Sequence, residues 1–143
     1  MDWFELMYKS LSVNVVCFSY RGFSDSDGDP TQPGLILDAQ AAVDFCKQEK
    51  RINQDRVFVC GRSLGGAVAI HLTAALDRMG DNYIKGCVVE NTFTSILEMA
   101  DLMFPILAGK PGCKKAIMCD HWDSEQEVVH IKTPIYFIAG KND

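Results

Sequence analysis

Four short apolar runs, rich in β-branched and aromatic residues, divide the chain and predict four strands. They lie at residues 13–20, 56–61, 83–90 and 133–140. Before and between them, apolar residues recur at the spacing of a helix face or fill a segment almost completely. These segments predict helices over residues 2–11, 34–50 and 64–79.

Strands that alternate with helices are typical of βαβ units. They indicate an α/β fold with a mostly parallel sheet of about four strands. Because the strand runs are apolar throughout instead of alternating with polar residues, we expect helices to cover the sheet on both faces. A length of 143 residues suits a single domain over residues 1–143.

Some 40 residues separate the third predicted strand from the fourth. This is too long for a simple crossover and predicts a helical insertion over about 98–130, placed as a cap above the carboxyl edge of the sheet. Phe104, Leu107 and Ile117 are expected to face the sheet or an apolar acyl pocket there. A plain packing role fits these side chains equally well.

The segment Gly61-Arg62-Ser63-Leu64-Gly65 joins the second predicted strand to the third predicted helix. A G-x-S-x-G sequence in that context is typical of a nucleophile elbow, a sharp turn that presents the serine hydroxyl at the carboxyl end of the sheet. The turn is expected to leave no room for side chains at Gly61 and Gly65. The backbone N–H of Leu64 would then face the oxyanion of an acyl-transfer reaction, helped by the helix N-terminus.

Two other interpretations of this turn are open. The glycines can mark a tight strand-to-helix turn without chemistry. A dinucleotide-binding turn is disfavoured, because the G-x-G-x-x-G pattern is missing.

Charge and hydropathy narrow the function classes. The formal net charge is −5 and the sequence pI is near 5.1, which argues against a nucleic-acid binder that must neutralise phosphates. No apolar run reaches the length of about 18 residues that spans a membrane. The first helix carries Asp2 and Glu5 and lacks the basic start of a signal peptide.

The six cysteines favour a reducing compartment. Four of them lie in predicted strands or on a helix face, where buried free thiols are the expected state. These are Cys17, Cys46, Cys60 and Cys87. Cys113 and Cys119 lie in a looser segment where they can pair or bind something. Cys119 and His121 are too few ligands for a zinc site, so no metal is expected.

Four stretches together resemble the α/β-hydrolase superfamily. Within it, they resemble the branch of α/β-hydrolase domain-containing protein thirteen and the fungal bud-emergence (Bem) suppressor proteins. They are YRGFSDSDG, GRSLGGAVAIHLTA, VVENTFTSI and TPIYFIAGKND. The resemblance covers most of residues 13–143 and is weakest over 98–130. Ser19 stands where relatives often have Asp, which weakens the match only at that turn.

The resemblance implies a serine hydrolase that acts on a small-molecule or lipid-like acyl ester or thioester without a cofactor. Ser63 matches the nucleophile, and Asp143 matches the acid that orients a histidine. A serine peptidase is the alternative among enzymes. A pseudo-hydrolase that binds a partner without catalysis is the alternative outside them.

The order Ser, acid, His that is typical of the superfamily leaves the histidine unassigned. His71, His121 and His130 all precede Asp143. We expect His71 to pack within its helix and His130 to lie at the opposite end of the sheet, whereas His121 falls in the insertion. Glu90, at the end of the third predicted strand, is a second candidate acid, although a turn-capping role is favoured for it.

The resemblance also implies that the chain is an incomplete segment of the domain. Nothing before Val13 predicts the earlier strand whose following loop supplies the second oxyanion donor. In the sheet, that missing strand would lie in space between the predicted strands at residues 13–20 and 56–61. With no matching histidine and no second donor, the 143-residue chain is expected to be a poor catalyst. Any membrane attachment would depend on regions that are absent here.

Overall fold

A computed structural model describes residues 3–96, 99 and 121–141 of the 143-residue chain. The elements follow in the order α1 (Trp3–Leu11), α2 (Gln32–Gln48), β1 (Phe58–Arg62), α3 (Leu64–Arg78), β2 (Gly86–Glu90), α6 (Ser124–Val128) and β3 (Ile135–Ile138). The three helices predicted from the sequence are all present, each within two residues of its expected start and end.

The strands form one parallel sheet in the order β1-β2-β3. Arg62 of β1 pairs with Glu90 of β2, which pairs with Ile138 of β3, so the carboxyl ends of all three strands share one edge. The α/β architecture predicted from the alternating pattern is therefore confirmed, with a parallel sheet and helices packed against it.

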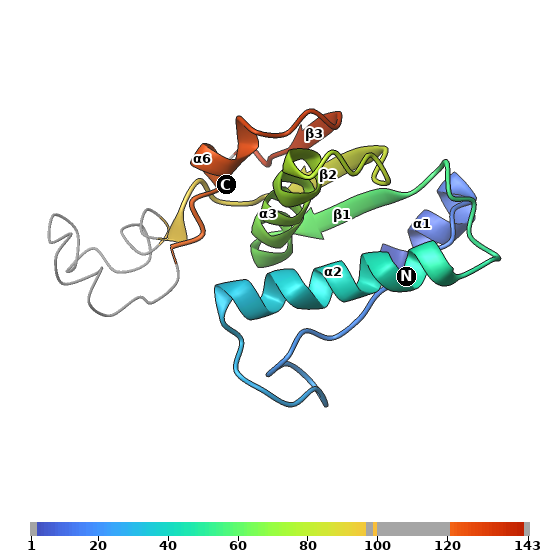
Figure 1. The fold of residues 1–143 in the computed structure, drawn as a ribbon, viewed down its shortest axis with the longest axis horizontal. Coiled ribbons are helices and arrows are strands. Elements are labelled where there is room, and N and C mark those ends of the chain that lie inside the picture. Colours follow the sequence, from blue (N-terminus) through green and yellow to red (C-terminus); the bar gives the residue numbers. More distant parts are fainter. Residues whose placement is uncertain (1–2, 97–98, 100–120, 142–143) are drawn as a thin grey trace, which may run out of the picture.

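Helix α3 is the centre of the packing. Ten of its fifteen residues are buried, because it lies across β1 and β2 on one side and meets α2 and α6 on the other (Figure 1). Leu72 and Leu76 of α3 join Leu35 and Val43 of α2 in the larger core cluster. This uniform burial explains why the α3 sequence is apolar on nearly every face.

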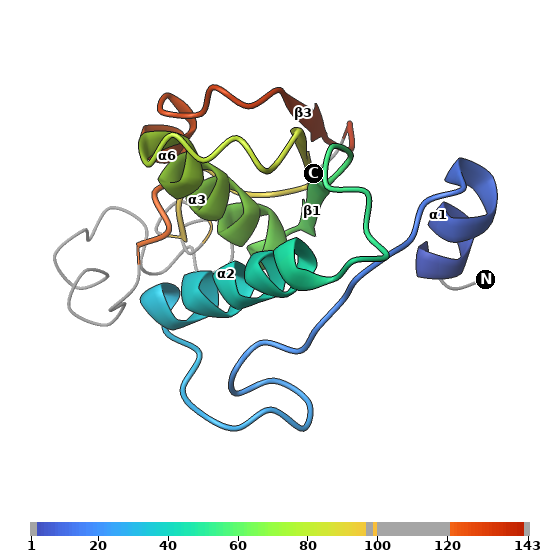
Figure 2. The ribbon, with the colours of Figure 1, turned by 45° about the vertical axis from the view of Figure 1, so that its right-hand side comes forward.

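The opposite face of the sheet carries exposed apolar side chains. Phe58 is 62% exposed and Tyr136 is 67% exposed. Cys60, which aligns with Tyr136 through Val88 in the register, is exposed as well. The expectation that helices cover both faces is therefore wrong for the described part of the chain. Its helices α2, α3 and α6 gather on one face, and α1 stands apart from them (Figure 2).

Residues 13–20 do not form the predicted strand. They have no regular secondary structure and are mostly exposed, with Val16 at 48% and Phe18 at 44% exposure, and they pair with no described strand. The sheet therefore has three described strands where four were expected. An apolar run becomes a strand only when a neighbouring backbone accepts its hydrogen bonds, and the described structure offers this run no such neighbour.

The predicted insertion over 98–130 is described mainly at its end. There, Asp123 accepts a hydrogen bond from the Gln126 N–H and caps α6, which packs along α3. Phe104, Leu107, Ile117, Cys113 and Cys119 lie outside the described residues. Their predicted roles, and the cap itself, stay predictions.

Candidate active site at the Ser63 turn

Ser63 stands between the last residue of β1 and the first residue of α3, at the carboxyl edge of the sheet. Its backbone has φ 52° and ψ −121°, a conformation that L residues rarely adopt. The side chain is exposed and makes no capping hydrogen bond to the helix. The hydroxyl is therefore free to react at this edge.

The N-terminus of α3 presents unused donors next to Ser63. The Gly66 and Ala67 N–H groups donate to the Ser63 carbonyl oxygen at 2.9 and 3.3 Å. The N–H groups of Leu64 and Gly65 have no acceptor within the described ranges, as is usual for the first turn of a helix. Such donors, with the positive end of the helix dipole, stabilise an anion.

The two flanking glycines, Gly61 and Gly65, differ in the space that their surroundings leave for a side chain. A Cβ on Gly61 would lie 2.1 Å from the Gly65 carbonyl oxygen, so no side chain fits at position 61, as expected. A Cβ on Gly65 would meet only the Tyr20 hydroxyl, at an ordinary 3.9 Å. The expectation that Gly65 has no room is therefore wrong. The second close approach is at Gly66, where a Cβ would lie 2.7 Å from the Cβ of Thr92.

Tyr20, which leads into the turn after residues 13–20, has its hydroxyl close to Gly65. The Arg21 guanidinium donates to the Asp38 carboxylate from Nε at 3.0 Å and from Nη2 at 2.7 Å, and the Arg21 backbone N–H donates at 2.9 Å. These bonds fasten the turn to α2 and hold the pKa of Asp38 below its usual value. Burial, with a smaller effect of the Asp38 charge, raises the pKa of Tyr20. The phenol near Gly65 therefore keeps its proton at neutral pH.

Within the described residues, none of the three histidines makes a hydrogen bond to Ser63. His71 lies eight residues along α3 from Ser63, about 12 Å at the usual helix rise. It is buried as expected, edge-on to Trp122 with ring centroids 5.4 Å apart, and burial lowers its pKa. His121 donates its backbone N–H to the Gln32 side chain, and His130 follows α6 on the way to the start of β3.

The two candidate acids differ in what can be described. Glu90 ends β2 at the same edge as Ser63, and its carboxylate lies 3.8 Å from Nε of the exposed Arg62. Asp143 lies outside the described residues, so its predicted role stays a prediction.

Two residues that matter at this turn were not singled out from the sequence. The Thr92 hydroxyl donates to the Ser63 carbonyl oxygen at 2.9 Å, and the Asn91 side-chain oxygen accepts from the Gly140 N–H at 3.0 Å. Both lie in the VVENTFTSI stretch that the family resemblance had marked, which was the available signal.

Two cysteines of the described ranges are more exposed than the sequence predicts. Cys17 and Cys60 are exposed, contrary to the expectation of burial, whereas Cys87 is buried and its pKa rises to about 11 because of that burial. All four cysteines of the described ranges are free thiols. No group of three metal-ligating side chains occurs among the residues that the structure describes.

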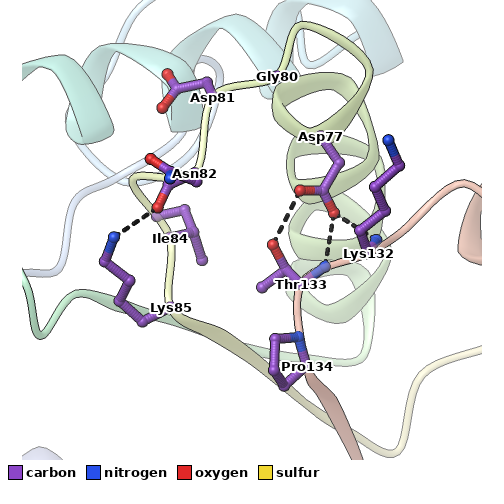
Figure 3. A pocket seen from close by; sticks show the side chains of 9 residues that line it. All are labelled: Asp77, Gly80, Asp81, Asn82, Ile84, Lys85, Lys132, Thr133 and Pro134. Atoms are coloured by element: carbon purple, nitrogen blue, oxygen red, sulfur yellow. Dashed lines mark hydrogen bonds between the residues drawn. The ribbon is translucent and has the colours of Figure 1, made fainter.

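A hollow lies at the other edge of the sheet. It has a volume of about 430 Å³ and is bordered by the end of α3 and the chain just before β2 and β3 (Figure 3). There, the Asp77 carboxylate accepts from the backbone N–H groups of Lys132 and Thr133 at 2.6 and 2.8 Å and from the Thr133 hydroxyl at 3.0 Å (Figure 3). Asp77 thus anchors the start of β3, away from Ser63.

Several known proteins are similar to this chain in sequence. Residues 2–136 match the model of the Alpha/beta hydrolase family. The chain is 36% identical to the alpha/beta hydrolase domain-containing protein WAV2 of Arabidopsis thaliana, over all of the chain and 48% of that protein. It is also 36% identical to the protein bem46 of Schizosaccharomyces pombe, over 97% of the chain and 44% of that protein.

A solved structure shares the fold. The crystal structure of an alpha-beta hydrolase from Vibrio vulnificus superimposes with a TM-score of 0.68 at 24% identity, over 82% of this chain and 43% of that one. The chain thus spans about half the length of the relatives that it matches. Within the described ranges, no helix has the length and apolar character needed to cross a membrane.

Proposed function

Because the chain belongs to the alpha/beta hydrolase family, we propose that it carries the nucleophile of a serine hydrolase that acts on acyl esters or thioesters. The observation that carries the proposal is the Ser63 turn. It combines a strained backbone, an exposed hydroxyl and two N–H groups at the start of α3 that have no acceptor among the described residues. A tight turn without chemistry would not require the serine hydroxyl to be left free of the helix cap.

In the proposed reaction, Ser63 Oγ attacks the acyl carbon and its proton passes to a general base. The carbonyl electron pair moves onto oxygen, where the Leu64 N–H donates to it. The tetrahedral intermediate then expels the alcohol or thiol, which takes up the proton. Water removes the acyl group from Ser63 in a second cycle of the same steps, restoring the serine.

Esters and thioesters are proposed in preference to peptides because their leaving groups depart more easily. The acyl group is proposed to be a small-molecule or lipid-like one. Two triad roles are part of the proposal: Asp143 orients a histidine, and that histidine is the general base. The nearest histidine along the chain, His71, is buried against Trp122 about two helical turns away and is not proposed for this role.

The general base has a large effect on the rate. Without one, a serine hydroxyl is a weak nucleophile at neutral pH. General-base help is worth about 10²–10⁴ in rate, so loss of the proposed histidine is expected to bring turnover near background.

The test is hydrolysis of matched ester, thioester and anilide substrates by the natural protein, translated from its own start codon to its own stop codon. We expect ester and thioester turnover that falls to background in Ser63→Ala, with slower anilide turnover. Asp77→Asn, at the opposite edge of the sheet, is the control for general damage. A correctly folded protein with no Ser63-dependent turnover would overturn the proposal and favour a non-catalytic binding protein.

A further inference from the structure

We propose that the turn Glu90-Asn91-Thr92 is a positioning element, which fixes the strained peptide at Ser63 and ties it to the backbone at Gly140. The inference rests on the proposed function of Ser63 as the nucleophile. It adds two residues, Asn91 and Thr92, whose effect on the reaction is exerted through the groups that they hold.

Towards Ser63, the turn holds both ends of the same residue. The Ser63 N–H donates to the Glu90 carbonyl oxygen at 3.0 Å, and the Ser63 carbonyl oxygen accepts from the Thr92 hydroxyl at 2.9 Å. Rotation about φ or ψ of Ser63 would break one of these bonds. Thr92 is also the side chain that leaves no room for a Cβ on Gly66, so the turn is pressed directly against α3.

Towards β3, the turn makes two further bonds. The Asn91 N–H donates to the Ile138 carbonyl oxygen at 2.8 Å, and the Asn91 side-chain oxygen accepts from the Gly140 N–H at 3.0 Å. Asn91 adopts φ 45°, which asparagine tolerates better than most residues. The sequence places Asp143 three residues after Gly140, so this contact fixes the chain that leads to the proposed acid.

The physical reason for such an element is the conformation of Ser63. A non-glycine residue with this φ and ψ is strained and persists only where its surroundings hold it. By themselves, the hydrogen bonds of the helix fix only the carbonyl side of Ser63, through the N–H groups of Gly66 and Ala67. Glu90 and Thr92 add bonds from a segment almost 30 residues away in the chain, and they connect the Ser63 turn to the end of β3.

The test reads the environment of position 63 without relying on hydrolysis. In Ser63→Cys, the thiol pKa is measured from the pH dependence of alkylation, followed at that peptide by mass spectrometry. A thiol held at the N-terminus of a helix has a pKa of about 7.5 or lower, against about 8.5 for a free one. We expect adding Thr92→Val to raise the pKa towards the free value, and Thr92→Ser to restore it.

A matched control separates positioning from stability. Thr73→Val removes a buried hydroxyl that donates to the Ala69 carbonyl oxygen at 2.7 Å within α3. It is expected to lower the melting temperature and leave the thiol pKa at position 63 unchanged. An unchanged thiol pKa in folded Thr92→Val would overturn the inference, whatever the hydrolysis assays show.

The link to Gly140 has its own readout, which also serves if Thr92→Val does not fold. Asn91→Gly keeps the positive φ and removes the side-chain acceptor, whereas Asn91→Asp keeps an acceptor. We expect the Gly140 amide to exchange its hydrogen at least several-fold faster in Asn91→Gly than in Asn91→Asp. In the natural protein, the same pair should differ in kcat with little change in KM. Equal exchange in the two variants would overturn this part of the inference.

Discussion

The backbone of Gly65 passes so close to Gly61 that a Cβ on Gly61 would lie 2.1 Å from the Gly65 carbonyl oxygen. The neighbouring atoms are backbone and cannot rotate away. Gly61→Ala is therefore expected to lower the free energy of unfolding by about 1–3 kcal/mol or more. Gly65→Ala is the matched control, because its Cβ has room and alanine favours a helix. It should leave stability unchanged or raise it by up to about 1 kcal/mol.

Urea unfolding of the two alanine variants provides the measurement. Equal destabilisation of both variants would contradict the geometry of the turn.

The burial of the His71 side chain predicts that the stability of the protein depends on pH. Burial against Trp122 lowers its pKa, opposed in part by the carboxylates of Glu127 and Asp123 and reinforced by Arg78. The unfolded chain therefore takes up a proton at a higher pH than the folded chain. The contribution of the neutral His71 side chain to stability is complete above pH 6.5, the ordinary pKa of histidine. It is lost as the pH falls below that value.

Replacing His71 by phenylalanine keeps an aromatic ring beside Trp122 and removes the titration. Between pH 6.5 and 5, the wild-type free energy of unfolding should fall more steeply than that of His71→Phe, by up to about 1.4 kcal/mol per pH unit. His130→Gln measures the background of replacing an exposed histidine. Parallel curves for wild type and His71→Phe would contradict the burial of this side chain.

The Arg21–Asp38 pair predicts a second pH effect with a different range. Hydrogen bonds from Arg21 lower the pKa of Asp38, so its stabilising contribution is present above pH 3.8, its ordinary value, and is lost as the pH falls through the lowered value. Asp38→Asn should melt at a lower temperature than wild type at pH 7. The gap should close below about pH 4.

The control for Asp38→Asn is Asp44→Asn, which changes an exposed carboxylate on the same helix. It should change the melting temperature much less at pH 7. Equal effects of the two substitutions would show that Asp38 does not fasten the Tyr20 turn to α2.

The exposed face of the sheet predicts self-association of the 143-residue chain. Cys60, Val88 and Tyr136 are adjacent in the register, so they form a continuous apolar strip, and large exposed apolar patches promote association. Tyr136→Lys should reduce the concentration-dependent rise in sedimentation coefficient. Met79→Lys changes an exposed apolar residue after α3 and should have little effect. Similar behaviour of the two variants would indicate that the strip is not responsible.

Local patterns were sufficient to predict α2, α3 and the Ser63 turn. In α3, burial on nearly all sides leaves an unmistakable apolar sequence, and a strand followed by Gly61, Ser63 and a helix defines the turn locally. Residues 13–20 were predicted wrongly, because whether an apolar run becomes a strand depends on a backbone elsewhere in space. The exposure of Cys60 follows from the same cause, since only the arrangement of helices decides which face is covered.

The contacts that hold Ser63 in place show the same limit. Thr92 and Ser63 are 29 residues apart, and Asn91 and Gly140 are 49 apart, so no periodicity within a segment relates them. The sequence marked the stretch around Thr92 only by family resemblance. Which of its atoms meet Ser63 follows from the parallel register that brings Arg62 and Glu90 side by side.

The most direct test of the central claim, that Ser63 is a nucleophile, is to map the adduct of a fluorophosphonate on the natural protein by mass spectrometry. Ser12 and Ser24 are internal controls, because they are exposed and have nearly the same positive φ, 53° and 51°, without the N-terminus of a helix beside them. We predict a single adduct, on Ser63, formed about 100-fold or more faster than on the heat-unfolded protein. Equal modification of Ser63, Ser12 and Ser24, or a faster adduct on another serine, would contradict the account.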